Sequence, residues 1–297
     1  MLRACLAAGL LSVALAVPVG AQDAQALRAR HADLGEQLAA SPFGRPLQVM
    51  SHERSSEQRG EVYATVAQAF GTVAAALLPL RNWCDILILP VNVKHCEASG
   101  PGAAETLRIH LARNPHDALE ETFRLELAYE VLAATDDYLQ VALSAPDGPF
   151  GTRNYRMGLE AAPLDSRHTI LYLSYAFRPG LAARLAMQLY LATSGRDKVG
   201  FTLVERLPDG EPVYIDGVRG AIERNTMRYF LAIEAYLGAL DAPPPERLER
   251  RLRAWHAASE RHRPQLYEIG RDEYLRMKRQ EAGAVMAAAR SANQAPR

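Results

Sequence analysis

Lysine, cysteine and long apolar runs are all scarce in this sequence. Lysine occurs only at positions 94, 198 and 278, so the 34 basic residues are nearly all arginine, and they balance 34 acidic ones. That balance gives no indication of a nucleic-acid partner. After the first 21 residues, no segment approaches the roughly 20 apolar residues that a membrane-spanning helix needs. We therefore expect a mature protein that is soluble or at most peripheral to a membrane.

The motifs of several common catalytic classes are also missing. The sequence has no GxSxG turn, no HExxH pair and no carboxylate-rich metal spacing, and its eight histidines are scattered. Acid–base pairs could be imagined at His52-Glu53, at Glu126 with Glu130, and at Asp136-Asp137. Strand alternation and turn chemistry favour solvated or locally hydrogen-bonded roles for the last two pairs. We predict no catalytic residue, no metal site and no cofactor.

The first 21 residues have the layout of a secretory signal. One early cation, Arg3, precedes an apolar run from Leu6 to Val17, and small residues follow at Val19-Gly20-Ala21. The mature chain is expected to start near Gln22. Scarce lysine and abundant alanine are typical of a GC-rich bacterial genome. We therefore predict export across the inner membrane to the periplasm.

Cysteine is limited to three positions. Cys5 lies before the apolar run and would be removed with the signal, which leaves Cys84 and Cys96. An oxidising compartment favours their pairing, so we predict a disulfide. The alternative, a redox or metal-binding pair, lacks CxxC spacing and has only the adjacent His95 as a further ligand.

The mature chain begins with a predicted N-terminal helix and turn, residues 22–45, because leucines recur at helical spacing between Asp23 and Ala40. Extended patterns follow, with a helix from Ala67 to Leu80 and, after it, a short apolar segment from Trp83 to Leu89. The extended segments are Leu47 to His52, Glu61 to Val66, Thr106 to Ala112, Phe123 to Val131, Tyr138 to Ala145, Asn154 to Ala161 and His168 to Phe177. Short turns join the later strands, which predicts an antiparallel sheet.

The C-terminal part is mainly helical. A helix from Leu181 to Ala192, a hairpin from Gly200 to Ile215 and a long helix from Gly217 to Leu240 are expected. Residues 241–290 are predicted to form a helical extension, and residues 291–297 a disordered tail. The extension would hold two helices, Glu246 to His262 and Gln265 to about Ala289.

This order of elements resembles the START-like, or helix-grip, superfamily, in which a curved sheet wraps a long helix around an apolar cavity. The resemblance is carried by Gly60-Glu61-Val62-Tyr63 before the helix at Ala67 to Leu80, by Trp83-Cys84-Asp85, and by the strands from Thr106 to Phe177. It implies an α+β domain over residues 46–240, with an antiparallel curved sheet wrapped on a long helix and additional C-terminal helices.

The resemblance leaves two candidates for the gripping helix. The segment from Leu181 to Ala192 would span little more than half of the about 30 Å that a helix of about 20 residues spans. The segment from Ala221 to Leu240 is longer, and its apolar residues fall on two faces of the helical wheel. That pattern suits a helix placed between the sheet and the C-terminal helices.

Aromatic residues concentrate on one face of the expected strands. Core packing explains such a face, and so does a ligand cavity, which would give the phenol hydroxyls hydrogen-bond partners. In the last strand, Tyr175 and Phe177 lie on the side opposite to Tyr172. The candidate ligand-binding residues from the strands are Phe123, Tyr129, Tyr155, Met157 and Tyr172.

Arg224 and Arg228 project one turn apart into the alanine-rich face of the long helix. Buried guanidinium groups need an anionic partner. Internal carboxylates would satisfy them, although Glu223 and Glu234 lie on another side of the wheel. The alternative is the anionic head group of a ligand, such as a lipid phosphate or a fatty carboxylate. Both arginines are therefore added to the candidate ligand-binding residues.

The favoured function is the binding or carrying of a hydrophobic small molecule, such as a lipid, in the cavity that the resemblance implies. An enzyme of the same fold, of the cyclase or hydrolase type, is the alternative, and a polar constellation in the cavity would favour it. A third hypothesis is an envelope protein without a ligand, whose charged C-terminal helices contact a membrane or another protein. A cavity filled by its own side chains would favour that hypothesis.

Overall fold

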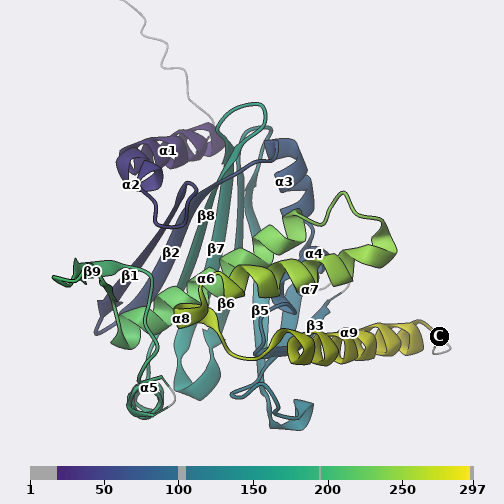
Figure 1. Ribbon diagram of the computed structural model, residues 1–297. Helices are drawn as coiled ribbons and strands as arrows, with labels where there is room; N and C mark the ends of the chain where they lie inside the picture. Colours follow the sequence, from purple (N-terminus) through teal and green to yellow (C-terminus); the bar gives the residue numbers. More distant parts are fainter. Residues whose placement is uncertain (1–18, 100–104, 194, 295–297) are drawn as a thin grey trace, which may run out of the picture.

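The computed structural model describes residues 19–99, 105–193 and 195–294 (Figure 1). Of the predicted signal over residues 1–21, residues 1–18 lie outside this range, and α1 (Val19–Asp33) begins in its last three residues. Of the predicted tail over residues 291–297, the first four residues belong to α9 (Arg271–Gln294), and the last three lie outside the described range.

Within the described residues, the main sheet has eight strands in the order β1-β2-β8-β7-β6-β5-β4-β3, each antiparallel to its neighbours. The curved sheet stands behind the long helices in Figure 1. The α+β class and the antiparallel sheet predicted from the sequence are confirmed. The strands are β1 (Leu47–Arg54), β2 (Glu57–Val66), β3 (Val93–Ala98), β4 (Thr106–Leu111), β5 (Phe123–Ala134), β6 (Leu139–Asp147), β7 (Arg153–Pro163) and β8 (Thr169–Arg178).

Strand β5 shows how the alternating pattern produces the sheet. Leu125, Leu127 and Tyr129 point into the core and are buried, while Glu126 and Glu130 are exposed between them. Period-two alternation therefore sends one set of side chains to each face. The solvated role expected for the two glutamates is confirmed.

The opposite, outer face of the sheet is covered by α1 and α2 (Gly35–Ala39). Leu27, Leu34 and Leu38 are buried there and share a small core with Tyr63 and Tyr172. This cover explains why β8 is buried on both faces. The helix predicted from Asp23 to Ala40 is therefore two helices with a break between them.

Helix α6 (Gly217–Leu237) is the gripping helix, and it crosses the sheet against β1, β2 and β8 (Figure 1). A side-chain Cβ at position 60 would collide with Ile222 and Thr226, so Gly60 in β2 allows α6 to lie close to the sheet. The shorter candidate, α5 (Leu181–Ala192), instead exposes Leu181 and most of its other residues. The sequence left both candidates open, and the structure selects α6, which packs against the sheet and against α7.

Two short helices, α3 (Phe70–Leu77) and α4 (Leu80–Leu87), lie between β2 and β3. The helix predicted from Ala67 to Leu80 is present as α3 with shorter bounds, and most of the apolar segment from Trp83 to Leu89 belongs to α4. Pro79 is extended and separates the two helices. The predicted disulfide is present and joins Cys84 in α4 to Cys96 in β3. Strand β3 was missed by the sequence analysis.

The remaining elements follow β8. The predicted hairpin is confirmed as β9 (Leu203–Arg206) and β10 (Pro212–Tyr214), which pair between α5 and α6. After α6 come α7 (Pro244–Glu260), α8 (Arg263–Leu266) and α9. Their apolar residues, including Leu252, Trp255, Leu266 and Leu275, belong to the same core as the sheet. In the described part of the chain, no helix has the length and apolar character needed to cross a bilayer.

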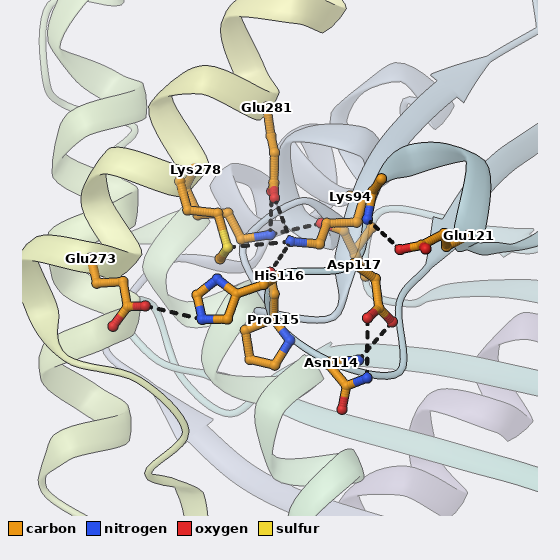
Figure 2. Close-up of polar contacts among 12 residues, drawn as sticks. Lys94, Asn114, Pro115, His116, Asp117, Glu121, Glu273, Lys278 and Glu281 are labelled. Carbon is orange, nitrogen blue, oxygen red and sulfur yellow. Dashed lines mark hydrogen bonds and ion pairs between the residues drawn. The ribbon is translucent and has the colours of Figure 1, made fainter.

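Two buried lysines fix α9 against β3 and the loop after β4 (Figure 2). Lys278 is fully buried and donates hydrogen bonds to the Val93 carbonyl at 2.7 Å and to Glu281 at 2.8 Å. Lys94 donates to the same carboxylate at 2.9 Å and to the Pro115 carbonyl. Burial lowers the pKa of Lys278 to about 8, although the Glu281 carboxylate opposes this change.

The disulfide should contribute measurably to stability. It closes a loop with a sequence separation of 12, for which chain entropy predicts about 3 kcal/mol. We expect the double variant Cys84→Ser, Cys96→Ser to lose about that much free energy of unfolding in denaturant titrations. Reduced wild-type protein should lose a similar amount. Two reactive thiols in unfolded, unreduced mature protein would contradict the bond.

The buried Lys278 should make stability depend on pH. Its folded pKa lies below the unfolded value, so between pH 8 and roughly 10 the unfolded state binds more protons, and stability rises with pH across that window. Between about pH 7.5 and about pH 9.5 the gain should be roughly 1 to 2 kcal/mol, measured by urea unfolding. Lys278→Met should lack this rise. The control Arg276→Met, which removes an exposed cation from the same helix, should keep it. Parallel pH profiles for all three proteins would refute the assignment.

Candidate functional site

A pocket of about 1090 Å³ lies between the concave face of the sheet, α5 and α6. It is at the end of the sheet where β5 and β7 begin and β8 ends, next to α5 in Figure 1. Helices α3 and α4 pack at the other end of the concave face, where the Tyr129 hydroxyl donates to the Leu78 carbonyl. Among the described residues, it is therefore the α5 end of the concave face that leaves room for this pocket.

One wall of the pocket is aromatic. Tyr155 on β7, Tyr175 and Phe177 on β8 and Tyr229 on α6 are all buried and line it. The Tyr175 ring lies 5.2 Å from the Tyr155 ring and 5.7 Å from the Tyr229 ring. Burial raises the pKa of all three phenols, and Tyr155 also interacts with the other two hydroxyls. They therefore stay protonated near neutral pH and act as hydrogen-bond donors.

Arg224 lines the same pocket from α6 and is 1% exposed. Its guanidinium donates to the Val199 carbonyl at 3.2 Å and to the Tyr190 hydroxyl at 3.1 Å. Both acceptors are neutral, and no ion pair of Arg224 occurs within 4 Å among the described residues. Burial is the largest influence on its pKa and lowers it.

Arg228, one turn further along α6, has a carboxylate partner. Its side chain is 12% exposed and forms an ion pair with Glu268 at 2.8 Å. It also donates to the Asn225 amide oxygen at 3.0 Å, while its buried Nε has no hydrogen-bond partner among the described residues. The expectation of internal carboxylates therefore holds for Arg228 and not for Arg224. Glu234 pairs with Arg45 instead, as its position on the wheel indicated.

The rim of the pocket is formed largely by α5. Met187, Leu189 and Tyr190 of this helix line the pocket, together with Phe123 at the start of β5. The outward surface of α5 exposes leucines at helical spacing: Leu181 is 77%, Leu185 58% and Leu189 66% exposed. An apolar molecule approaching the pocket from this side would therefore meet apolar surface first.

The sequence-predicted site residues are only partly brought together. Four of them line the pocket, namely Phe123, Tyr155, Arg224 and Arg228. Tyr129 and Met157 are buried in the main core. Tyr172 does not face the pocket, because it lies on the outer face, where its hydroxyl interacts with Glu61 and accepts a hydrogen bond from Arg59 at 2.6 Å.

The sequence analysis missed other lining residues. Tyr175 and Phe177 could have been selected, because strand parity places them on the face opposite to Tyr172. Tyr229 could have been selected from its position one residue after Arg228. Nothing in the sequence pattern placed Tyr190 or Glu268 near the arginines, since both come from other helices or loops.

In the described part of the chain, no group of three or more His, Cys, Asp or Glu side chains is arranged to hold a metal ion. The polar groups that line the pocket include guanidinium, phenol, hydroxyl and amide groups and two carboxylates, Glu53 and the ion-paired Glu268. This set can bind an anion or donate hydrogen bonds.

No protein-family model matches this chain, and no curated protein sequence does either. Several solved structures resemble it in part. The Zhui aromatase/cyclase from Streptomyces sp. R1128 is 17% identical, with a TM-score of 0.31 over 50% of this chain and 86% of that one. Human StAR-related lipid transfer protein 5 is 15% identical, with a TM-score of 0.31 over 59% and 90%. A protein of unknown function from Enterococcus faecalis is 10% identical, with a TM-score of 0.35 over 75% and 96%.

These scores are low, so the fold is assigned from the topology of the chain itself. Two short helices separate β2 from β3, the meander from β3 to β8 returns to pair with β2, and α6 crosses the concave face. The chain has the START-like, helix-grip fold. It adds β1 at one edge, α1 and α2 on the outer face, α7 and α8 beside the gripping helix, and α9 against β3 and α7.

The two arginines should differ in their effect on stability. Arg228→Met leaves Glu268, which is 29% exposed, without its cation, and we expect a loss of about 1 to 2 kcal/mol in the free energy of unfolding. Arg224→Met removes a buried cation that has only neutral acceptors, so the change should be within about 1 kcal/mol or favourable. Denaturant unfolding of both variants without ligand measures this. A large loss for Arg224→Met would show that the empty protein depends on this cation.

Proposed function

We propose that the protein binds and carries a hydrophobic small molecule, such as a lipid, in the pocket between the sheet, α5 and α6. The observation that carries the proposal is the pocket itself, about 1090 Å³ of space that side chains leave unfilled next to a buried aromatic wall. A pocket of this size is at the upper end of the range for small-molecule sites. The unfilled space argues against the hypothesis of an envelope protein without a ligand.

An enzyme of the same fold receives less support from the pocket. A general base works best with a pKa near the operating pH. Burial moves the pKa of the phenols of Tyr155, Tyr175 and Tyr229 upward, away from that range. Glu268, the carboxylate in contact with Arg228, is held in an ion pair. These groups are better suited to holding a ligand than to moving protons.

We further propose that the protein works in the periplasm. The secretory layout of residues 1–21 and the Cys84–Cys96 disulfide support this location. N-terminal sequencing of protein recovered from a periplasmic extract should find a start near Gln22.

Contact of the C-terminal helices with a membrane or a partner protein stays a prediction. The larger apolar residues of these helices, such as Trp255, are buried in the protein's own core and give that prediction no support.

Narrowing the pocket at its rim should weaken ligand binding without unfolding the protein. Ala186 on α5 lines the pocket and is exposed, so Ala186→Trp can enlarge the side chain at the rim. We expect it to weaken binding of the neutral apolar probe N-phenylnaphthylamine by about fivefold or more, measured by probe fluorescence. The control Ala192→Trp places the same residue on an exposed part of α5 away from the pocket and should bind like wild type. Absence of probe binding to the wild-type protein would leave the proposed function without support.

A further inference from the structure

The inner part of the pocket carries more positive than negative charge. Arg224 and Arg228 line it, and after burial the positive charge of Arg228 and that of Arg224 lower the pKa of the nearby Lys198. The carboxylate that interacts with all three cations is Glu268. Lys198 itself donates to the Tyr267 carbonyl at 2.5 Å, which is a neutral acceptor. Three cations therefore share one carboxylate at this end of the pocket.

The hydrogen bonds of the two arginines leave donors for a further acceptor. A guanidinium has five N–H donors. The bonds of Arg224 go to the Val199 carbonyl and the Tyr190 hydroxyl, and the buried Nε of Arg228 has no partner among the described residues. Buried cations are costly unless an anion neutralises them. An anionic group of a ligand would supply both the charge and the missing acceptors.

The aromatic wall begins next to these cations. Tyr229 follows Arg228 on α6 and contacts Tyr175, which contacts Tyr155 and Phe177 in turn. The lining therefore changes from cationic to aromatic within one pocket. A molecule with an anionic end and an apolar body matches this order of groups.

We propose that the ligand is an anionic amphiphile, with a carboxylate or phosphate monoester held by Arg224 and Arg228 and an apolar chain along Tyr155, Tyr175 and Phe177. This inference rests on the proposed function and adds the chemical class of the ligand. Guanidinium groups bind both carboxylate and phosphate through paired N–H donors. Both anions are therefore tested.

The test compares ligands that share one chain and differ in the end group. Hexadecanoate, hexadecyl phosphate and hexadecanol each compete with N-phenylnaphthylamine for the wild-type protein, and inorganic phosphate is added as the anion alone. We expect at least one of the two anionic amphiphiles to bind about tenfold or more tightly than the alcohol. Their order shows which anion the site prefers. Equal binding of all three would overturn the inference and leave the proposed function standing. Displacement of the probe by inorganic phosphate alone would also overturn it.

Arg224→Gln should remove the preference for the anionic ligands while hexadecanol still binds. The matched control is Arg196→Gln, which removes an exposed arginine that donates to the Ala192 carbonyl and does not line the pocket. It should keep the preference, because its cation is exposed and is not part of the pocket lining. An unchanged preference in Arg224→Gln would overturn the role of this arginine. The wild-type comparison among ligands needs no variant, so the proposal can be judged even if Arg224→Gln folds poorly.

Discussion

The structure depends on the burial of charged residues along α6. The helix is enclosed by the sheet on one side and by α7 on the other, yet it carries Glu223, Arg224, Arg228 and Glu234. Each of these charges needs partners away from water. Glu223 is fully buried and accepts hydrogen bonds from the Ser51 hydroxyl at 2.7 Å and from the Phe201 and Thr202 amides at 2.6 and 2.9 Å. These bonds fix the chain before the β9–β10 hairpin against α6 and β1.

The partners of the other three charges come from distant parts of the chain. Glu234 binds Arg45, which precedes β1, and Arg228 binds Glu268, which lies between α8 and α9. The gripping helix is therefore attached to both the N-terminal and the C-terminal additions to the fold. Arg224 differs because its hydrogen-bond acceptors, Val199 and Tyr190, are neutral. The chemistry of the site follows from this buried positive charge, which has no carboxylate in direct contact among the described residues.

The position of the pocket follows from how the concave face is divided. Helices α3 and α4 fill one end, and the disulfide holds α4 to the edge strand β3. The other end faces α5, whose residues are mostly exposed and which forms a rim instead of packing into the core. Aromatic side chains on the concave face therefore pack into the core where α3 and α4 cover them. Where these helices do not reach, the aromatic side chains line the pocket. This division explains why Tyr129 packs while Tyr155 and Tyr175 line the site.

The sequence by itself determined the strand alternation, the antiparallel connections and the disulfide, and it narrowed the gripping helix to two candidates. These features depend on local periodicity, turn chemistry and the count of available cysteines, which are readable along the chain. It set the end of the first short helix at Leu80, past Pro79, where α4 already begins, and it missed the short strand β3, half of whose residues are polar. The alternation of side chains along β8 placed Tyr172 and Tyr175 on opposite faces of the sheet. Which of these faces holds the pocket depends on the positions of α1 and α6. Only the tertiary structure decided that Arg228 meets Glu268, that Arg224 meets neutral groups, and that one end of the sheet stays open. Partners separated by tens of residues are chosen by packing, and no local pattern records them.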